Sequence, residues 1–172
     1  MKKTLQLIIA LLSLAASVSA QQPSHDHQQH QDRKHHDEVN KRGDHAMGFS
    51  HAKTTHHFLL KTGGGVIQVE ANDANETASR DQIRQHLKHI AKKFAEGDFA
   101  APMFIHAQTP PGVPAMKRLK AEIEYRYEET ERGAQVRIST RSAEAIKAIH
   151  EFLRFQIEDH RTGDSPKVSD GR

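Results

Sequence analysis

Histidines are the residues whose number and spacing in this sequence could do chemistry, since the chain has 14 of them and no cysteine. A neutral imidazole is a common protein ligand for zinc, copper and nickel, and protonation near its unperturbed pKa of about 6.5 releases the metal. The densest group lies in HDHQQHQDRKHH, residues 25–36, a stretch with no apolar side chain. Its five histidines are His25, His27, His30, His35 and His36.

This stretch predicts an arm that gathers metal ions. A flexible chain can bring several imidazoles around one ion, although the entropy lost in ordering the chain lowers its affinity. Carboxylates among the histidines, at Asp26, Asp32, Asp37 and Glu38, could balance the charge of the ion. An arm that only solubilises the protein or responds to pH is the alternative, because a histidine-rich tract is compositional evidence alone.

A second group lies in MGFSHAKTTHH, residues 47–57. His56 and His57 are consecutive in a predicted strand, so they point to opposite faces and at most one of them faces the core. His51 precedes the strand and could fold back toward either face. Met47 would add a soft sulfur ligand if the ion is cuprous. The alternative is a polar strand edge with one buried, hydrogen-bonded histidine.

The remaining candidate ligands are His86, His89, Met103, His106 and His150. His86 and His89 are neighbours on a predicted helix and could chelate weakly, although two solvated histidines are the simpler interpretation. Met103 and His106 lie on a connector, and His150 lies near an apolar helical stripe, where a hydrogen-bonded core histidine is the simpler interpretation. His86, Met103, His106 and His150 could converge where the connector meets two helices, giving a ligand set typical of copper.

The first 20 residues have the pattern of an export signal. Lys2 and Lys3 precede an apolar run, Leu5–Ala16, that is too short to span a membrane stably. Small residues then end at Ala20, after which we expect cleavage. The predicted location is periplasmic or secreted, without membrane association after cleavage; an uncleaved anchor is the alternative.

Composition narrows the classes of function. Lys2 and Lys3 contribute two units of the formal net charge of +3, and no basic stripe with interleaved aromatic residues is present, so we expect no nucleic-acid partner. The lack of cysteine excludes disulfides, thiolate metal sites and cysteine nucleophiles. Any metal must therefore be held by His, Met, Asp or Glu.

The polar composition of residues 21–46 predicts a disordered N-terminal arm, because this segment has too little apolar surface to offset the entropy of ordering. A single domain is predicted over residues 47–160. The segment 161–172 is rich in Gly, Ser, Pro and charged residues, which predicts a disordered tail.

Alternating apolar residues predict two hairpins, one over residues 54–71 with its turn at Gly63–Gly65, and one over residues 122–138 with its turn at residues 130–133. An amphipathic helix follows each hairpin. The apolar stripes are Ile83, Leu87, Ile90, Ala91, Phe94 in the first helix and Ile146, Ile149, Leu153, Ile157 in the second.

This order predicts an α+β fold of duplicated ββα units, with a four-stranded antiparallel sheet and both long helices on one face. The other sheet face could be solvated, covered by the connector, or used to form a homodimer.

The stretch ISTRSAE, residues 138–144, bears on catalysis. Its run Ser139-Thr140-Arg141-Ser142 is similar to the Ser-Thr-Arg-Thr phosphate-binding turn of aspartate and ornithine carbamoyltransferases, which holds carbamoyl phosphate at a helix start. The similarity covers this short run alone, and the His-Pro motif of those longer enzymes is missing. A helix-capping Ser142 with a solvated Arg141 is the simpler interpretation. The residues favour a protein without catalytic activity.

Three stretches carry a wider resemblance: MGFSHAKTTHHFLL, HLKHIAKKFAEGDFAAPMFIHAQTPPG and IHEFLRFQIEDHRTGD. Over residues 38–164 the chain resembles a group of small exported bacterial proteins with a MGFxHxKTTHHF-type motif. Some of them bear an aspartate carbamoyltransferase label that their residues do not support. The resemblance implies a shared fold and export, and it carries over no catalytic residues.

These observations predict an exported protein that binds copper, zinc or nickel ions as a buffer or carrier. The arm would gather ions, and histidines of the domain with Met103 would form a tighter site. A non-catalytic interaction or stress-related module, with incidental histidines, is the main alternative. A carbamoyl-phosphate-type transferase, suggested only by Ser139-Thr140-Arg141-Ser142, is a minor one.

Overall fold

The computed structural model describes residues 25–170, and for residues 25–28 it describes the backbone alone. The predicted export signal and its cleavage site lie outside this range. None of the helices in the described range has the length and apolar character that crossing a bilayer requires.

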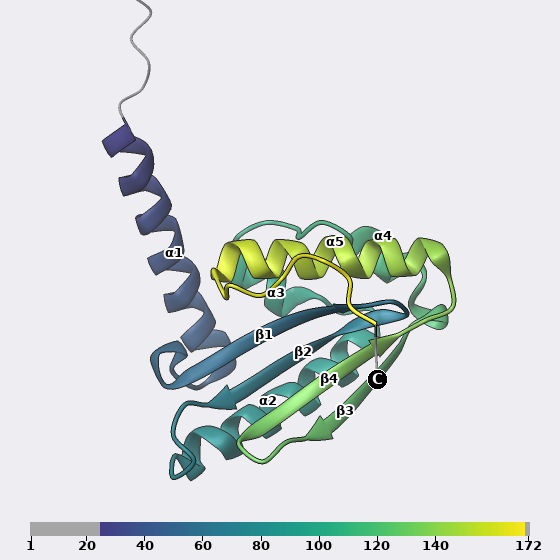
Figure 1. The fold of residues 1–172 in the computed structure, drawn as a ribbon, viewed down its shortest axis with the longest axis horizontal. Coiled ribbons are helices and arrows are strands. Elements are labelled where there is room, and N and C mark those ends of the chain that lie inside the picture. Colours follow the sequence, from purple (N-terminus) through teal and green to yellow (C-terminus); the bar gives the residue numbers. More distant parts are fainter. Residues whose placement is uncertain (1–24, 171–172) are drawn as a thin grey trace, which may run out of the picture.

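A four-stranded antiparallel sheet with the order β1-β2-β4-β3 forms the centre of the fold (Figure 1). Its strands are β1 (Thr54–Lys61), β2 (Gly64–Ala71), β3 (Glu124–Glu129) and β4 (Gly133–Ser139). The predicted α+β fold with a four-stranded antiparallel sheet is therefore confirmed. Each hairpin precedes a long helix along the chain; that the two units arose by duplication stays a prediction.

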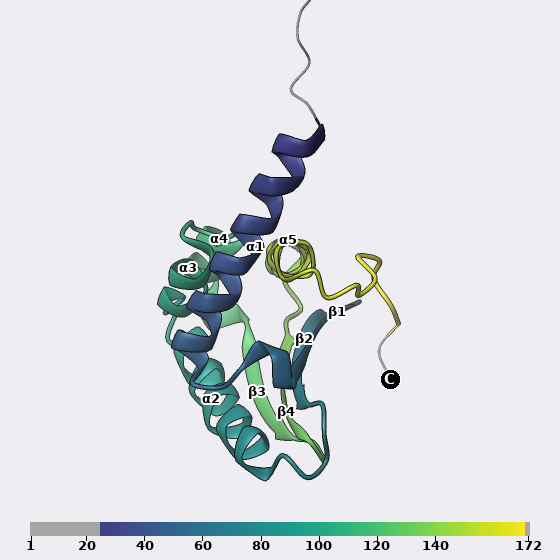
Figure 2. The same cartoon turned by 90° about the vertical axis from the view of Figure 1, so that its left-hand side faces the viewer.

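Two long helices pack on the same face of this sheet. They are α2 (Thr77–Ala95), which contacts mainly β3 and β4, and α5 (Ala143–His160), which contacts β1 and β2. Gly65 allows the close approach of α5, since a Cβ atom there would lie 2.2 Å from Cδ1 of Leu153. Two short helices connect the halves of the chain: α3 (Ala100–His106) and α4 (Val113–Arg118). Figure 2 shows α2, α3 and α4 gathered on one side of the sheet.

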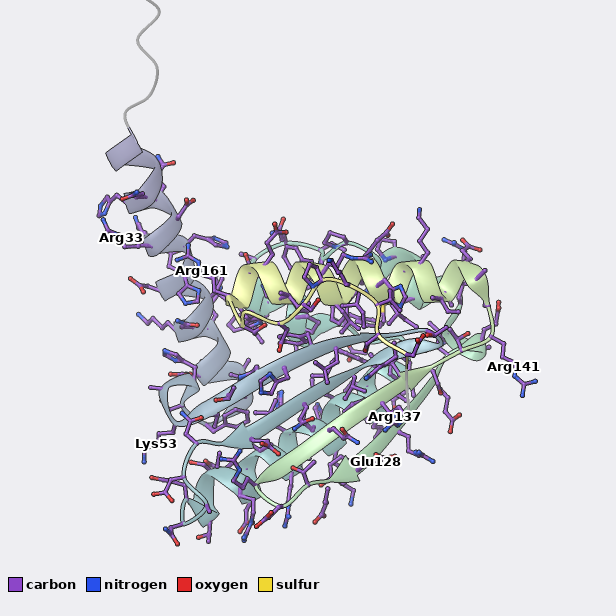
Figure 3. The ribbon with its side chains drawn as sticks, in the orientation of Figure 1. Arg33, Lys53, Glu128, Arg137, Arg141 and Arg161 are labelled. Atoms are coloured by element: carbon purple, nitrogen blue, oxygen red, sulfur yellow. The ribbon has the colours of Figure 1, made fainter. Side chains whose placement is uncertain are left out.

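The core lies between the sheet and these helices. Alternation along β1 turns Phe58 and Leu60 inward, opposite Ile67 and Gly65 of β2, while Val136 of β4 continues the same row. The other sheet face carries charged side chains on β3 and β4, including Glu128 and Arg137 (Figure 3). A homodimer through this face stays a prediction, and its interface would have to be largely polar.

The N-terminal arm differs from its prediction. Residues 25–46, predicted to be disordered, form most of helix α1 (His25–Met47). Val39 of this helix is fully buried, Arg42 donates a hydrogen bond of 2.6 Å to the carbonyl oxygen of Ile105, and Arg161 donates one of 2.9 Å to that of Asp32. These contacts compensate for the polar composition, so α1 contacts the domain from Asp32 onward while its first turns project outward (Figure 1).

The predicted disordered tail is also wrong over residues 161–170. This segment runs beside the edge strand β1, where Asp164 accepts a hydrogen bond of 2.9 Å from the backbone N–H of Phe58. The backbone N–H of Ser169 donates to the carbonyl oxygen of Leu60 at 3.0 Å. The tail thus satisfies part of the exposed edge of β1, and the ordered domain extends beyond residue 160.

Candidate functional site

A small cavity of about 60 Å³, here named the inner cavity, lies between the sheet, α2, α3, α5 and the end of α1. Its walls are mainly apolar. The apolar side chains of β1, β2, α2 and α5 that line it are Phe58, Ile67, Val69, Leu87, Ile90, Phe94 and Phe152. The polar and sulfur-containing side chains that line the same cavity are Met47, His56, His86, His106, Gln156 and His160.

Each of these histidines comes from a different element. His56 shares the inward face of β1 with Phe58, and His86 precedes Ile90 by about one turn on α2. His106 and His160 are the last residues of α3 and α5. The sheet and three helices therefore bring four imidazoles to one cavity, although they are far apart in the sequence.

The tightest part of this arrangement contains a thioether and two imidazoles. Nε2 of His56 lies 3.3 Å from Sδ of Met47. The rings of His56 and His160 are parallel, with an interplanar angle of 2° and centroids 5.9 Å apart. Met47, His56 and His160 are here named the Met–His–His group. His160 also contacts His106 edge to face, with centroids 4.9 Å apart.

Burial favours the uncharged form of three of the imidazoles, His56, His86 and His160. His56 and His86 keep some accessible surface as residues, but their rings are surrounded by protein, and burial lowers the pKa of each to about 4. Burial also lowers the pKa of His160 to about 3, with further contributions from His56 and His106. At neutral pH these rings therefore keep a free lone pair, which is the form that binds metals.

His106 has a supporting role instead. Its Nδ1 lies 2.5 Å from the carboxylate of Asp159, and its Nε2 lies 3.0 Å from Oε1 of Gln156. The same carboxylate lies 2.7 Å from Nε2 of His35 on α1. Burial alone would raise the pKa of Asp159, but the hydrogen bonds with His35 and His106 outweigh it and lower that pKa. Both ring nitrogens of His106 are thus engaged, and it fixes the end of α5 rather than offering a lone pair.

The suggested convergence of His86, Met103, His106 and His150 is wrong for two of the four residues. His86 and His106 line the inner cavity together. Met103 turns toward Nζ of Lys117, 3.9 Å from its sulfur, because the inward face of α3 is taken by residues such as His106. Nε2 of His150 lies 2.9 Å from the carbonyl oxygen of Lys61 at the β1–β2 turn, so it is a hydrogen-bonded core residue.

Other histidines predicted as ligands lie outside the inner cavity. His57 points to the opposite sheet face, where its Nδ1 lies 2.9 Å from a carboxylate oxygen of Asp164. His51 lies in the short 3₁₀ helix His51–Lys53 next to Asp44, and His89 is exposed on α2.

The histidines of the arm lie along α1. His30 and His35 are exposed and His36 is half-buried. The side chains of His25 and His27 lie outside the described part of the chain.

Of the Met–His–His group, His160 was not among the candidate ligands, and His56 was considered only as the strand neighbour of His57. The alternation along β1 indicated an inward position for His56, because His56 shares one strand face with the apolar residues Phe58 and Leu60. The apolar stripe of α5 indicated an inward position for His160, because His160 follows Leu153 by about two turns. Both signals required knowing that the inward faces of β1 and α5 meet at the same end of the fold.

The geometry limits which ions could bind. Among residues 25–170, no three His, Asp or Glu side chains stand close enough together to hold one ion. The Met–His–His group supplies instead one thioether and two imidazoles, which are soft or intermediate ligands.

Ser139, the first residue of the turn Ser139–Ser142, lines a cavity with Thr62 and Arg137. Thr140 Oγ1 accepts a hydrogen bond of 3.1 Å from the backbone N–H of Ser142, and Arg141 extends into solvent at the end of the molecule (Figure 3).

Comparison of this chain with family models, with curated proteins and with solved structures finds no match in any of the three.

Proposed function

We propose that this protein binds a copper(I) ion at Met47, His56 and His160 and serves as an exported buffer or carrier of that ion. The observation that carries the proposal is the 3.3 Å approach of Met47 Sδ to His56 Nε2 beside the parallel ring of His160. Thioether sulfur selects copper(I) over harder ions, and imidazole is a good ligand for copper. Low pKa values keep His56 and His160 in the unprotonated form that coordination needs.

The choice of copper(I) over zinc or nickel follows from the ligand set. Zinc sites in proteins are usually tetrahedral and built from Cys, His and carboxylates, whereas this group offers two imidazoles and a thioether. Copper(I) accepts low coordination numbers and soft ligands, so the group can suffice. The apolar wall of the inner cavity would shield the bound ion from water and oxidants.

The arm would contribute weaker binding. His30 and His35 are exposed on α1, and the density of histidines rises toward its N-terminal end. Exposed imidazoles on one helix can capture ions with modest affinity and raise their local concentration near the domain.

Competition with a chromophoric copper(I) chelator under reducing conditions tests the proposal on the whole chain from residue 21. The unsubstituted protein should retain copper(I) against the chelator, and the double variant Met47→Leu/His56→Gln should lose at least about tenfold in affinity, or ~1.4 kcal/mol. Leu fills nearly the volume of Met, so the fold should survive. The matched control is His89→Gln, which removes an exposed histidine of α2 and should bind normally. Equal affinity in the double variant and the unsubstituted protein would refute the site.

A further inference from the structure

A second cavity adjoins the Met–His–His group from the outside. This outer cavity, about 260 Å³ in volume, lies between α1 and β1. Met47, His56 and His160 line both cavities, so they form the partition between them. The outer cavity is also lined by His36 and His51 and by polar side chains such as Asn40 and Thr55. An ion could therefore reach the Met–His–His group through a cavity with several polar side chains on this side, whereas the inner side is mainly apolar.

His51, on one wall of the outer cavity, is oriented as metal-binding histidines usually are. Its Nδ1 lies 2.9 Å from Oδ1 of Asp44, and its backbone N–H donates to the same oxygen at 2.7 Å. Because a carboxylate accepts, Nδ1 carries a proton, and in the neutral ring the lone pair is then on Nε2. A carboxylate that fixes the tautomer and orientation of an imidazole in this way is the common partner of a histidine ligand.

His36, which comes from α1, has a comparable orientation. Its Nδ1 lies 3.4 Å from the backbone carbonyl oxygen of Asp159. A carbonyl oxygen also accepts, so in the neutral ring this contact again places the lone pair on Nε2. His36 lines the outer cavity together with His160, and His51 lines it together with His56. Both outer histidines thus face the same cavity as the two imidazoles of the Met–His–His group.

We propose that His36 and His51 form a loading site for copper(I), from which the ion passes to Met47, His56 and His160. This inference rests on the proposed function. The transfer is a ligand exchange: a bond from copper to an outer Nε2 breaks as a bond to His56 or His160 forms, and the thioether completes the inner set. The ion stays copper(I), and the exchange between neutral imidazoles releases no proton.

A loading site changes rates and leaves the affinity of the final site unaltered. The double variant His36→Gln/His51→Gln should therefore take up copper(I) severalfold more slowly and release it more slowly by the same factor, with unchanged equilibrium affinity. Stopped-flow mixing of the whole chain with a chromophoric copper(I)–chelator complex measures uptake, and mixing of loaded protein with excess chelator measures release. His89→Gln is again the matched control, since His89 is exposed and lines neither cavity.

The outcomes separate the two proposals. Failure of the unsubstituted protein to hold copper(I) at equilibrium would overturn the proposed function and the loading site with it. Normal affinity combined with unchanged rates in His36→Gln/His51→Gln would overturn the loading site alone. A loss of affinity in that variant would also overturn it, because His36 and His51 would then belong to the final site.

Discussion

His56 and His160 lie with their imidazole planes 2° apart and their ring centroids separated by 5.9 Å, although 104 positions separate them in the chain. One ring comes from the first strand and the other from the last residue of the last helix. Two parallel rings at this distance could not both be protonated without repulsion, and burial disfavours the charge on each. The fold therefore holds two neutral imidazoles side by side, next to a thioether.

Acid should destabilise the protein through these buried imidazoles. The pKa values of His56 and His86 are about 4 and that of His160 is about 3, whereas each would titrate near 6.5 in the unfolded chain. The unfolded state therefore binds more protons below pH 6.5, so the stabilisation is complete above that pH and falls as the pH approaches 4. The expected loss is ~2 kcal/mol per imidazole by about pH 4.5.

Urea unfolding over a pH series measures this loss as a change in the free energy of unfolding. The variant His56→Gln should show a flatter dependence between pH 6.5 and 4.5, because it lacks one of the titrating groups. Exposed His89 serves as the control, and His89→Gln should retain the full slope. A stability that stays constant across this window would show that the three rings are not held in their neutral form.

Substitution of Gly65 tests how α5 packs on the sheet. The Cβ atom of Gly65→Ala would lie 2.2 Å from Leu153 Cδ1 and 2.7 Å from the carbonyl oxygen of Leu59, so the helix or the strand would have to move. We expect a loss of ~1–3 kcal/mol in the free energy of unfolding. Gly63→Ala is the matched control, because the nearest atom to its Cβ would be 3.8 Å away. Equal stability of the two variants would contradict the packing described for α5.

Much of the fold could be predicted because its signals are local. The Gly63–Gly65 turn, the alternation along β1 and the stripe around Leu87 each depend on near neighbours in the sequence, and they predicted the sheet and its helices. The segments that differ, α1 and the tail, are held by long-range contacts. The burial of Val39 and the hydrogen bond of Asp164 at the edge of β1 both require the rest of the folded domain. The composition of these two segments does not predict those long-range contacts.

The candidate site was harder to predict for the same reason. Residue type and spacing correctly drew attention to His86 and His106, which share the inner cavity. Spacing could not show that His150 turns toward Lys61, or that Met47 rather than Met103 supplies the sulfur next to an imidazole. Those choices depend on which ends of the strands and helices meet, and that is a property of the tertiary structure.

Asp159 should be important for docking α1 and α3 onto α5. Its carboxylate contacts His35 at 2.7 Å and His106 at 2.5 Å, and hydrogen bonds to an ionised partner are stronger than neutral ones. Asp159→Asn should lower the free energy of unfolding by ~1–3 kcal/mol. Asp37→Asn, at an exposed position of α1, is the control and should have little effect. Thermal and denaturant unfolding both measure the difference, and similar values for the two variants would argue against this role.

Copper(I) should hold α1 on the domain, because Met47 is the last residue of α1 while His56 and His160 belong to β1 and α5. Val39 is the one fully buried apolar side chain among the described residues of this helix, so its docking in the free protein is expected to be weak. A ligand that binds only the docked form stabilises that form by mass action.

Hydrogen exchange of the second half of α1 should therefore slow on addition of copper(I), with little change in the centre of β4. The variant Met47→Leu keeps the apolar volume but lacks the sulfur, so its α1 should exchange at the same rate with and without the ion. If copper(I) slowed exchange equally in Met47→Leu, the ion would be acting on α1 through some group other than the thioether.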